Sequence, residues 1–353
     1  MSKSDKVPKL LGIVLVIAIA VFVISKPKTS TAPSTQEAIY PSPLYPHPST
    51  LFFAGDIMLS RNVHDRMQKA NDFTLPFQKV AEVTKNADIA FGNLESPFLD
   101  SGTHFIPNSL IFNADPKSVE GLNFAGFDIL STANNHAYDQ GLKGIEYTLR
   151  LLKDHGIIPV GTFSTDQRFD PSQNVISKNK IAFGFLSYSY SALNDGGRVT
   201  KPEVADMDIV KLKQDILTLK GHYSDTVIVN MHAGTEYTRT PTQKQIDFAH
   251  AAIDAGADLV VGQHPHWIQT YEEYKGKPIF YSLGNFVFDQ MWSQETKEGL
   301  TLLVTWGESG IEKIELRPVI IEDFCCPRWA NPEETSAILN KANLTTPLIF
   351  THN

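Results

Sequence analysis

The chain has 353 residues, of which 42% are hydrophobic and 20% charged, and its formal net charge is -8. This length and composition suit a large folded α/β protein and exclude an intrinsically disordered one. The acidic balance offers no basic groove for a phosphate backbone, so we expect no nucleic-acid partner. Cys325 and Cys326 are adjacent. Because a bridge between neighbours is strained, we expect the fold not to depend on disulfides.

The first 49 residues predict a membrane anchor followed by a linker. An apolar run over residues 10–24 follows three lysines, and as a helix it would be about 22 Å long. A cleavable signal peptide has a similar run, but no small-residue cleavage site follows, so we favour an uncleaved anchor over residues 1–25. Residues 26–49 are rich in Pro, Ser and Thr, as in an extended tether. The protein is therefore expected to cross the cell membrane once, with its C-terminal domain outside the cytoplasm.

Apolar segments that end in polar residues recur from the start of the folded domain, which we place at residues 50–320. The predicted strand 51–54 is followed by Asp56, and the predicted strand 88–91 by Glu95. Asn135 and His136 follow the third predicted strand, 127–132. Helical patterns lie between and after these strands, over residues 75–86, 115–125 and 141–155. This alternation predicts a largely parallel sheet covered by helices.

Histidines end the strands of the second half. A strongly β-branched strand over residues 226–231 is followed by His232. The helical pattern 241–255 then leads to a strand at 258–261, after which His264 and His266 flank a proline. Residues two apart on an extended chain face the same way, so the two imidazoles could grip one metal or hold one ion each of a pair. An isolated pair of this kind is weak evidence, because histidine is common at intermediate burial.

Hairpins predict that the sheet is mixed. Residues 174–187 form one around Lys178-Asn179-Lys180, and residues 268–282 and 299–318 form two more. An amphipathic helix is expected over residues 207–219. Residues 321–353 are expected to form a C-terminal extension.

The polar residues at the strand ends occur in the order carboxylate, carboxylate, Asn-His, His and His-x-His. The segments that carry them resemble the CapA family of capsule or poly-γ-glutamate synthesis proteins, within the calcineurin-like metallophosphoesterases. These segments are G-D-I-M at 55–58, G-N-L-E at 92–95, N-N-H-A-Y-D-Q-G at 134–141, H-A-G-T-E-Y at 232–237, G-Q-H-P-H at 262–266 and Y-S-L-G-N-F-V-F-D at 281–289. The resemblance implies a metallophosphatase-like sandwich of two mixed β-sheets flanked by helices.

The resemblance also implies a site for two divalent ions, for which this mixture of ligands suits Mn, Fe or Zn. His136 would protonate the leaving oxygen or stabilise developing charge, and Arg61 could clamp an anionic group. Met58 stands where the superfamily usually has a histidine, and Glu95 where it usually has an aspartate. The ligands implied are Asp56, Glu95 and His266 for one ion, and Glu95, Asn135, His232 and His264 for the other.

Two functions are compatible with this sequence. The first is a metal-dependent hydrolase of a phosphoester or of a bond in an anionic polymer. The alternative is a noncatalytic component of a membrane complex, with other capsule or poly-γ-glutamate synthesis proteins as partners. His136 favours the enzyme, whereas Met58 favours the component. We further expect Asp139 to shape the loop after His136, and Glu236 and Asp289 to orient histidines.

Overall fold

The structure is a computed structural model that describes residues 47–165, 170–194 and 196–351. The predicted anchor, and nearly all of the predicted linker, lie outside these residues. Among the helices in the described ranges, none is long and apolar enough to cross a membrane.

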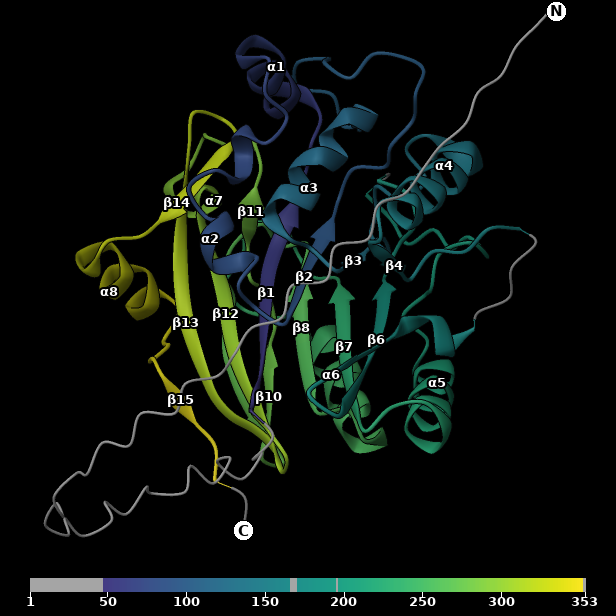
Figure 1. The fold of residues 1–353 in the computed structure, drawn as a ribbon, viewed down its shortest axis with the longest axis vertical. Coiled ribbons are helices and arrows are strands. Elements are labelled where there is room, and N and C mark those ends of the chain that lie inside the picture. The colour runs from purple at the N-terminus through teal and green to yellow at the C-terminus, as the bar shows by residue number, and fades with distance from the viewer. Residues whose placement is uncertain (1–46, 166–169, 195, 352–353) are drawn as a thin grey trace, which may run out of the picture. The chain divides into compact units, whose positions relative to one another are not determined.

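Two mixed β-sheets form the centre of the described fold, as the family resemblance implies (Figure 1). In the first sheet β1 to β4 are parallel neighbours, while β12, β13 and β14 continue the sheet in antiparallel pairs. Two short strands, β11 (Asn285–Val287) and β15 (Leu348–Ile349), pair with β1 and β13. The main strands are β1 (Ser49–Ile57), β2 (Ile89–Leu94), β3 (Ile129–Ser131), β4 (Ile158–Val160), β12 (Glu298–Gly307), β13 (Gly310–Glu322) and β14 (Cys326–Trp329).

The second sheet has the order β5-β6-β7-β8-β10-β9. Its inner strands β6, β7, β8 and β10 are parallel, and the edge strands β5 and β9 are antiparallel to their neighbours. The three predicted hairpins are confirmed as β5/β6, β9/β10 and β12/β13. The strands are β5 (Val175–Lys178), β6 (Ile181–Ser189), β7 (Thr226–His232), β8 (Leu259–Gln263), β9 (Tyr271–Tyr274) and β10 (Lys277–Phe280).

Strand β1 is buried on both faces, and its alternate side chains enter different cores. Leu51 and Phe53 pack between the sheets with residues of the second sheet such as Phe185. Phe52 and Ala54 belong instead to the core that the first sheet shares with its covering helices. Because both faces of β1 are buried, consecutive residues in its sequence are apolar and do not alternate with polar ones.

Helices cover both sheets. Against the first sheet lie α1 (Arg61–Ala70), α3 (Val119–Ala125) and α4 (Gly141–Asp154), and against the second lie α5 (Ile209–His222) and α6 (Gln243–Ala255). Helix α6 begins two residues later than predicted, because Thr242 and Gln245 form a capping box there. It ends at Gly256, whose φ of 111° places it in the left-handed region.

The single helix predicted over residues 75–86 is wrong. The segment forms a 3₁₀ turn, η1 (Leu75–Phe77), and a short helix, α2 (Ala81–Thr84). Val80 has a φ of -121° between the two and interrupts the helical path. The break carries both Phe77 and Val80 into the core, where burial outweighs helix continuity. The helix predicted over 115–125 likewise begins with a 3₁₀ turn, η2 (Pro116–Ser118).

The predicted C-terminal extension contributes to the first sheet. It supplies the end of β13, then β14, α8 (Pro332–Lys341) and β15. Ile338 and Leu339 of α8 are buried in the core that contains Leu51 and Phe53. Cys325 and Cys326 are joined by a disulfide at the start of β14. Because this bridge closes no loop of intervening residues, it restricts the unfolded chain very little.

Candidate metal centre

Five carboxylate and histidine side chains converge from the two sheets. The arrowheads of β1, β2, β7 and β8 point the same way in Figure 1, so the carboxyl ends of these strands lie on one side. Two groups of possible ligand atoms lie there, and within each group the atoms are within 4.8 Å of one another. One group is Asp56, Glu95 and His266; the other is Glu95, His232 and His264.

Glu95 belongs to both groups. It follows directly after β2 and is completely buried, yet neither of its carboxylate oxygens has a hydrogen-bond partner. Its Oε1 lies 3.8 Å from Nε2 of His232 and 3.9 Å from Nε2 of His266. A buried carboxylate without partners costs free energy unless a cation or donor compensates it. The residues present therefore fit bound metal, with Glu95 placed to be shared between two ions.

Asn135 joins the second group through its amide oxygen. Its Oδ1 lies 2.7 Å from Nε2 of His232, and its Nδ2 donates to Oδ1 of Asn194 at 3.1 Å. The second contact turns the amide oxygen toward His232. A separation near 3 Å is also what two adjacent ligands of one ion show at metal–ligand distances of about 2.1 Å. The structure thus places all six predicted metal ligands together.

Burial keeps His232 and His264 in the neutral form that can bind metal. Desolvation lowers the pKa of His264 to about 3, with further lowering by the neighbouring His266 and His136. Desolvation also holds the pKa of His232 well below its ordinary value. Conversely, burial followed by the charges of Asp56 and Glu236 raises the pKa of Glu95 well above its ordinary value. The pocket thus disfavours any charge that lacks a partner.

The two histidines of the His-Pro-His segment reach the site by a strained turn. His264 has a φ of 98° and His266 a φ of 56°, both in the left-handed region that non-glycine residues rarely occupy. Our expectation of an extended chain across this segment is therefore wrong, although both rings do face the site. Such backbone strain is typical of functional sites, where surrounding packing holds it in place.

Asn285 orients His266, and our sequence reasoning did not assign it a role. Its Nδ2 donates to the Thr296 carbonyl at 2.9 Å and to Oε1 of Gln290 at 3.1 Å. These bonds leave Oδ1 to accept from Nδ1 of His266 at 2.9 Å. The other ring nitrogen, Nε2, is then free to bind metal, an arrangement common among metal-ligating histidines. The G-N-F sequence in the family-like segment 281–289 was the available signal.

Asn93, two residues before Glu95, plays a comparable part. Its Nδ2 donates to Oδ1 of Asp56 at 2.8 Å and lies 3.2 Å from Nδ1 of His232. It therefore ties a ligand of one group to a ligand of the other. Sequence reasoning missed Asn93 because it lies within β2, where alternate residues usually serve the core.

His136 lies at the edge of the centre. Its Nε2 is 3.8 Å from Oε1 of Glu95, and its Nδ1 is 2.7 Å from Oδ2 of Asp139. The same oxygen of Asp139 accepts from the backbone N–H of Phe112 at 2.6 Å, and the Phe112 ring stacks on His136 with centroids 3.9 Å apart. Asp139 thus fixes the imidazole as well as shaping the loop. The hydrogen bond from the ring edge to Asp139 and the stacking of Phe112 on the ring face together hold the imidazole in one orientation.

Arg61 lies beside His136 and is nearly buried. Its guanidinium pairs with Asp289, donates from Nη1 to the Ser109 carbonyl at 3.0 Å and lies 4.8 Å from the centre of the Phe112 ring. Asp289 therefore holds an arginine, and its predicted role of orienting a histidine is wrong. The Nε of Arg61 is buried without a partner.

Met58 is not a candidate ligand. It is fully buried in the core of the first sheet, and its sulfur accepts from the backbone and hydroxyl of Ser60, both at 3.2 Å. The first group therefore has one ligand fewer than the usual superfamily pattern.

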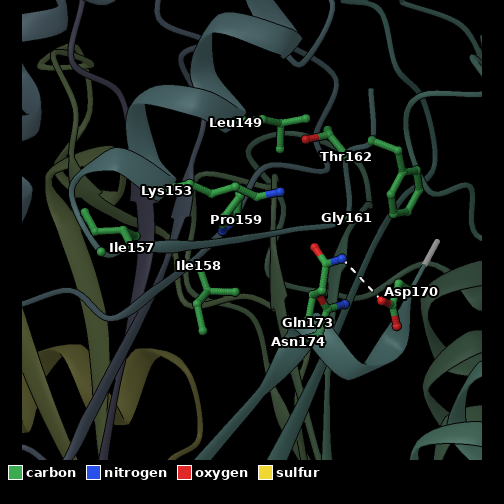
Figure 2. Close-up of a pocket in the computed structure, with 12 residues that line it drawn as sticks. Leu149, Lys153, Ile157, Ile158, Pro159, Gly161, Thr162, Asp170, Gln173 and Asn174 are labelled. Atoms are coloured by element: carbon green, nitrogen blue, oxygen red, sulfur yellow. Dashed lines mark hydrogen bonds between the residues drawn. The ribbon is translucent and has the colours of Figure 1, made fainter. Parts of the chain in front are cut away.

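A cavity of about 640 Å³ opens onto the centre. Arg61, His136, His264 and His266 line it, together with aromatic side chains and Glu236. Glu236 thus faces the cavity, and the structure describes no bond from it to a histidine. A separate hollow of about 220 Å³ lies beside α4 and β4 and contains none of the predicted site residues (Figure 2). Its polar contact is the bond from Gln173 Nε2 to Asp170 Oδ2 at 3.2 Å.

Fold and site together define a protein of two mixed sheets that presents a carboxylate–histidine centre suited to metal at their shared edge. The chain belongs to the family described as bacterial capsule synthesis protein PGA_cap, whose family model matches residues 50–290. It is 31% identical to the capsule biosynthesis protein CapA of Bacillus anthracis over 302 residues, which cover 83% of this chain and 71% of the relative. Identity to the PGA biosynthesis protein CapA of Bacillus subtilis (strain 168) is 32% over 275 residues, or 77% of this chain and 71% of the relative.

Solved structures give a more distant likeness. The sulfate thiohydrolase SoxB of Thermus thermophilus matches with a TM-score of 0.43 and 13% identity over 86% of this chain and 61% of that one. A 5'-nucleotidase precursor from Thermus thermophilus matches with a TM-score of 0.37 and 15% identity, covering 84% and 58% of the two chains.

Proposed function

We propose that the chain is a metal-dependent hydrolase that holds two divalent ions and acts in capsule or poly-γ-glutamate synthesis. The observation that carries this proposal is Glu95, a fully buried carboxylate with both oxygens unpaired between two groups of ligands. Asp56 and His266 would complete one ion's site, and Asn135, His232 and His264 the other's. Membership of the capsule synthesis family and the presence of CapA among the relatives support the biological role.

Ions bound there would activate water and neutralise charge on a phosphoryl or similar group. His136 has one nitrogen held by Asp139 and the other directed toward Glu95, so it is placed to give a proton to a leaving oxygen. Arg61 is fixed by Asp289 and lines the cavity, where it would bind an anionic part of the substrate. A phosphoester or an anionic polymer fits these groups.

A noncatalytic role in a membrane synthesis complex is the second candidate. Met58 favours it, because the missing ligand weakens the group of Asp56 and His266. In this case the metal centre would serve assembly or structure, and the other members of the complex would be its partners.

Metal analysis and turnover separate these functions. The purified full chain, loaded with Mn²⁺ or Zn²⁺, would be tested on a generic phosphodiester and on poly-γ-glutamate. Asn135→Ala should lose metal and turnover together, while Asn340→Ala, on an exposed position of α8, should retain both. Metal binding without turnover of either substrate would favour the noncatalytic component.

We also propose that residues 1–25 anchor the protein with its folded domain outside the cytoplasm, on the grounds of the apolar run, its preceding lysines and the proline-rich linker. Protease added to intact cells should then remove the domain. A protected domain would contradict this topology.

A further inference from the structure

The loop between β2 and α3 lies over the metal centre and is bonded to its outer groups. Figure 1 shows this loop beyond the ends of the strands. Arg61 donates from its backbone to the carbonyl of His104 and from its side chain to that of Ser109, both at 3.0 Å. Phe112, near the end of the loop, donates to the Asp139 carboxylate that also holds His136.

A third connection reaches a proposed metal ligand. Asn194 donates to the carbonyl of Leu110 at 3.3 Å and accepts from the amide of Asn135. The loop is thus tied to the arginine proposed to bind an anion, to the proposed proton donor and to the proposed ligand Asn135. Its backbone polar groups face the site, while several of its side chains face outward.

The outward side chains are strongly apolar. Residues 101–112 contain no Asp, Glu, Lys or Arg. Ile106 is 52% exposed, Leu110 66% and Ile111 62%. We call these three residues the apolar rim. Three exposed aliphatic side chains within six residues are unusual on a soluble surface and mark a contact for an apolar partner.

The apolar rim meets the cavity at Leu110. Leu110 lines the same cavity as Arg61, His264 and His266. The lining also includes the rings of Phe112 and Phe288. One end of the cavity therefore holds the metal centre, with Arg61 paired to Asp289 and with Glu236 in the lining, and bound ions would make that end positive. The other end is the uncharged aliphatic side chain of Leu110. A ligand that matches both ends has an anionic head and an aliphatic chain.

We propose that the cavity selects an anionic amphiphile, with its head group at Arg61 and the metal centre and its aliphatic chain on the apolar rim. This inference names the substrate class of the proposed hydrolase and rests on that proposed function for the position of the head group. In this proposal the apolar rim is covered by the aliphatic chain of the substrate. The absence of Asp, Glu, Lys and Arg from residues 101–112 favours that reading over a protein partner, since protein interfaces usually add polar and charged contacts around an apolar centre.

A series of alkylphosphonates tests the proposal by binding, without requiring turnover. The full chain would be reconstituted in phosphatidylcholine nanodiscs with saturating Mn²⁺, and methyl-, propyl- and pentylphosphonate titrated by calorimetry, with empty nanodiscs as the blank. Each methylene that leaves water for the rim should tighten binding by about two- to fourfold, so pentylphosphonate, which has four more methylenes than methylphosphonate, should bind roughly 16-fold or more tightly.

Matched variants show whether the apolar rim causes the dependence on alkyl chain length. Leu110→Ser and Ile111→Ser should flatten the dependence on chain length while leaving methylphosphonate binding unchanged. Leu217→Ser is the control, because Leu217 is 64% exposed on α5 and lies outside the cavity lining. Equal affinity across the series, or a dependence that persists in Leu110→Ser and Ile111→Ser, would overturn the inference and leave the proposed hydrolase standing. Failure of every phosphonate to bind the metal-loaded protein would refute the phosphoester site itself.

Discussion

Replacing Glu95 by glutamine should change stability in opposite directions with and without metal. The substitution keeps the shape of the side chain and removes its charge. In the metal-free protein the carboxylate is fully buried, both its oxygens lack partners, and its pKa is raised by burial and by the charges of Asp56 and Glu236. Burying an unpaired charge costs more than burying a neutral amide of the same shape, so Glu95→Gln should stabilise the metal-free protein at neutral pH, by on the order of 1–3 kcal/mol.

The pH dependence follows from the direction of the shift. An acid whose pKa is raised on folding loses stability as pH increases from its ordinary value, 4.5, toward its value in the folded state. The stability difference between variant and wild type should therefore grow with pH above about 4.5. With metal at 100 times its dissociation constant, each site adds about 2.7 kcal/mol to the wild type, and the variant should lose most of this gain at both sites.

Denaturant unfolding with EDTA and then with Mn²⁺ measures both effects. The wild type should be less stable than Glu95→Gln in EDTA and more stable in Mn²⁺. If the two proteins show the same response to Mn²⁺, Glu95 does not bind metal. If Glu95→Gln is destabilised in EDTA, Glu95 has a compensating partner and the reasoning from its unpaired oxygens is wrong.

Three further substitutions separate other roles. His136→Ala should retain metal but lower hydrolysis by roughly 100-fold, and loss of metal would show that it is a ligand. Asn285→Ala should weaken metal binding by about 10–100-fold at the site of His266 only. Equal metal affinity in Asn285→Ala and the wild type would refute the orienting role. Burial alone would raise the pKa of Asp258, but Lys277, the Val227 N–H and Lys220 lower it overall. Asp258→Asn should therefore lower the free energy of unfolding by about 1–2 kcal/mol at neutral pH, and this loss should shrink as pH falls below 3.8. A loss of stability that does not change with pH would contradict this assignment.

The strand ends were the most predictable part of the molecule. Apolar runs such as 51–54 and 226–231 are strands because they are buried on both faces, and each leads to a polar residue near the strand end that is itself fully buried. The sequence pattern therefore predicts Asp56 and His232 as neighbours without any coordinates. It cannot show that the two residues come from different sheets, because sheet membership depends on pairing between distant segments.

Other features depended on tertiary contacts that leave little local signal. Phe77 and Val80 follow helical spacing, but packing breaks the helix between them. The left-handed backbone of His264 and His266 is imposed by its surroundings, since neither residue prefers it. Asn285 is recognisable as orienting His266 only once β11 is seen beside β1.

The central claim is that Glu95 is shared by two metal ions. A crystal of the Mn²⁺-loaded protein, measured at the manganese absorption edge, tests it most directly. We expect two anomalous peaks about 3.5–4 Å apart on either side of the Glu95 carboxylate, one beside Asp56 and His266 and the other beside His232 and His264. A single peak, or peaks that do not contact Glu95, would contradict the account.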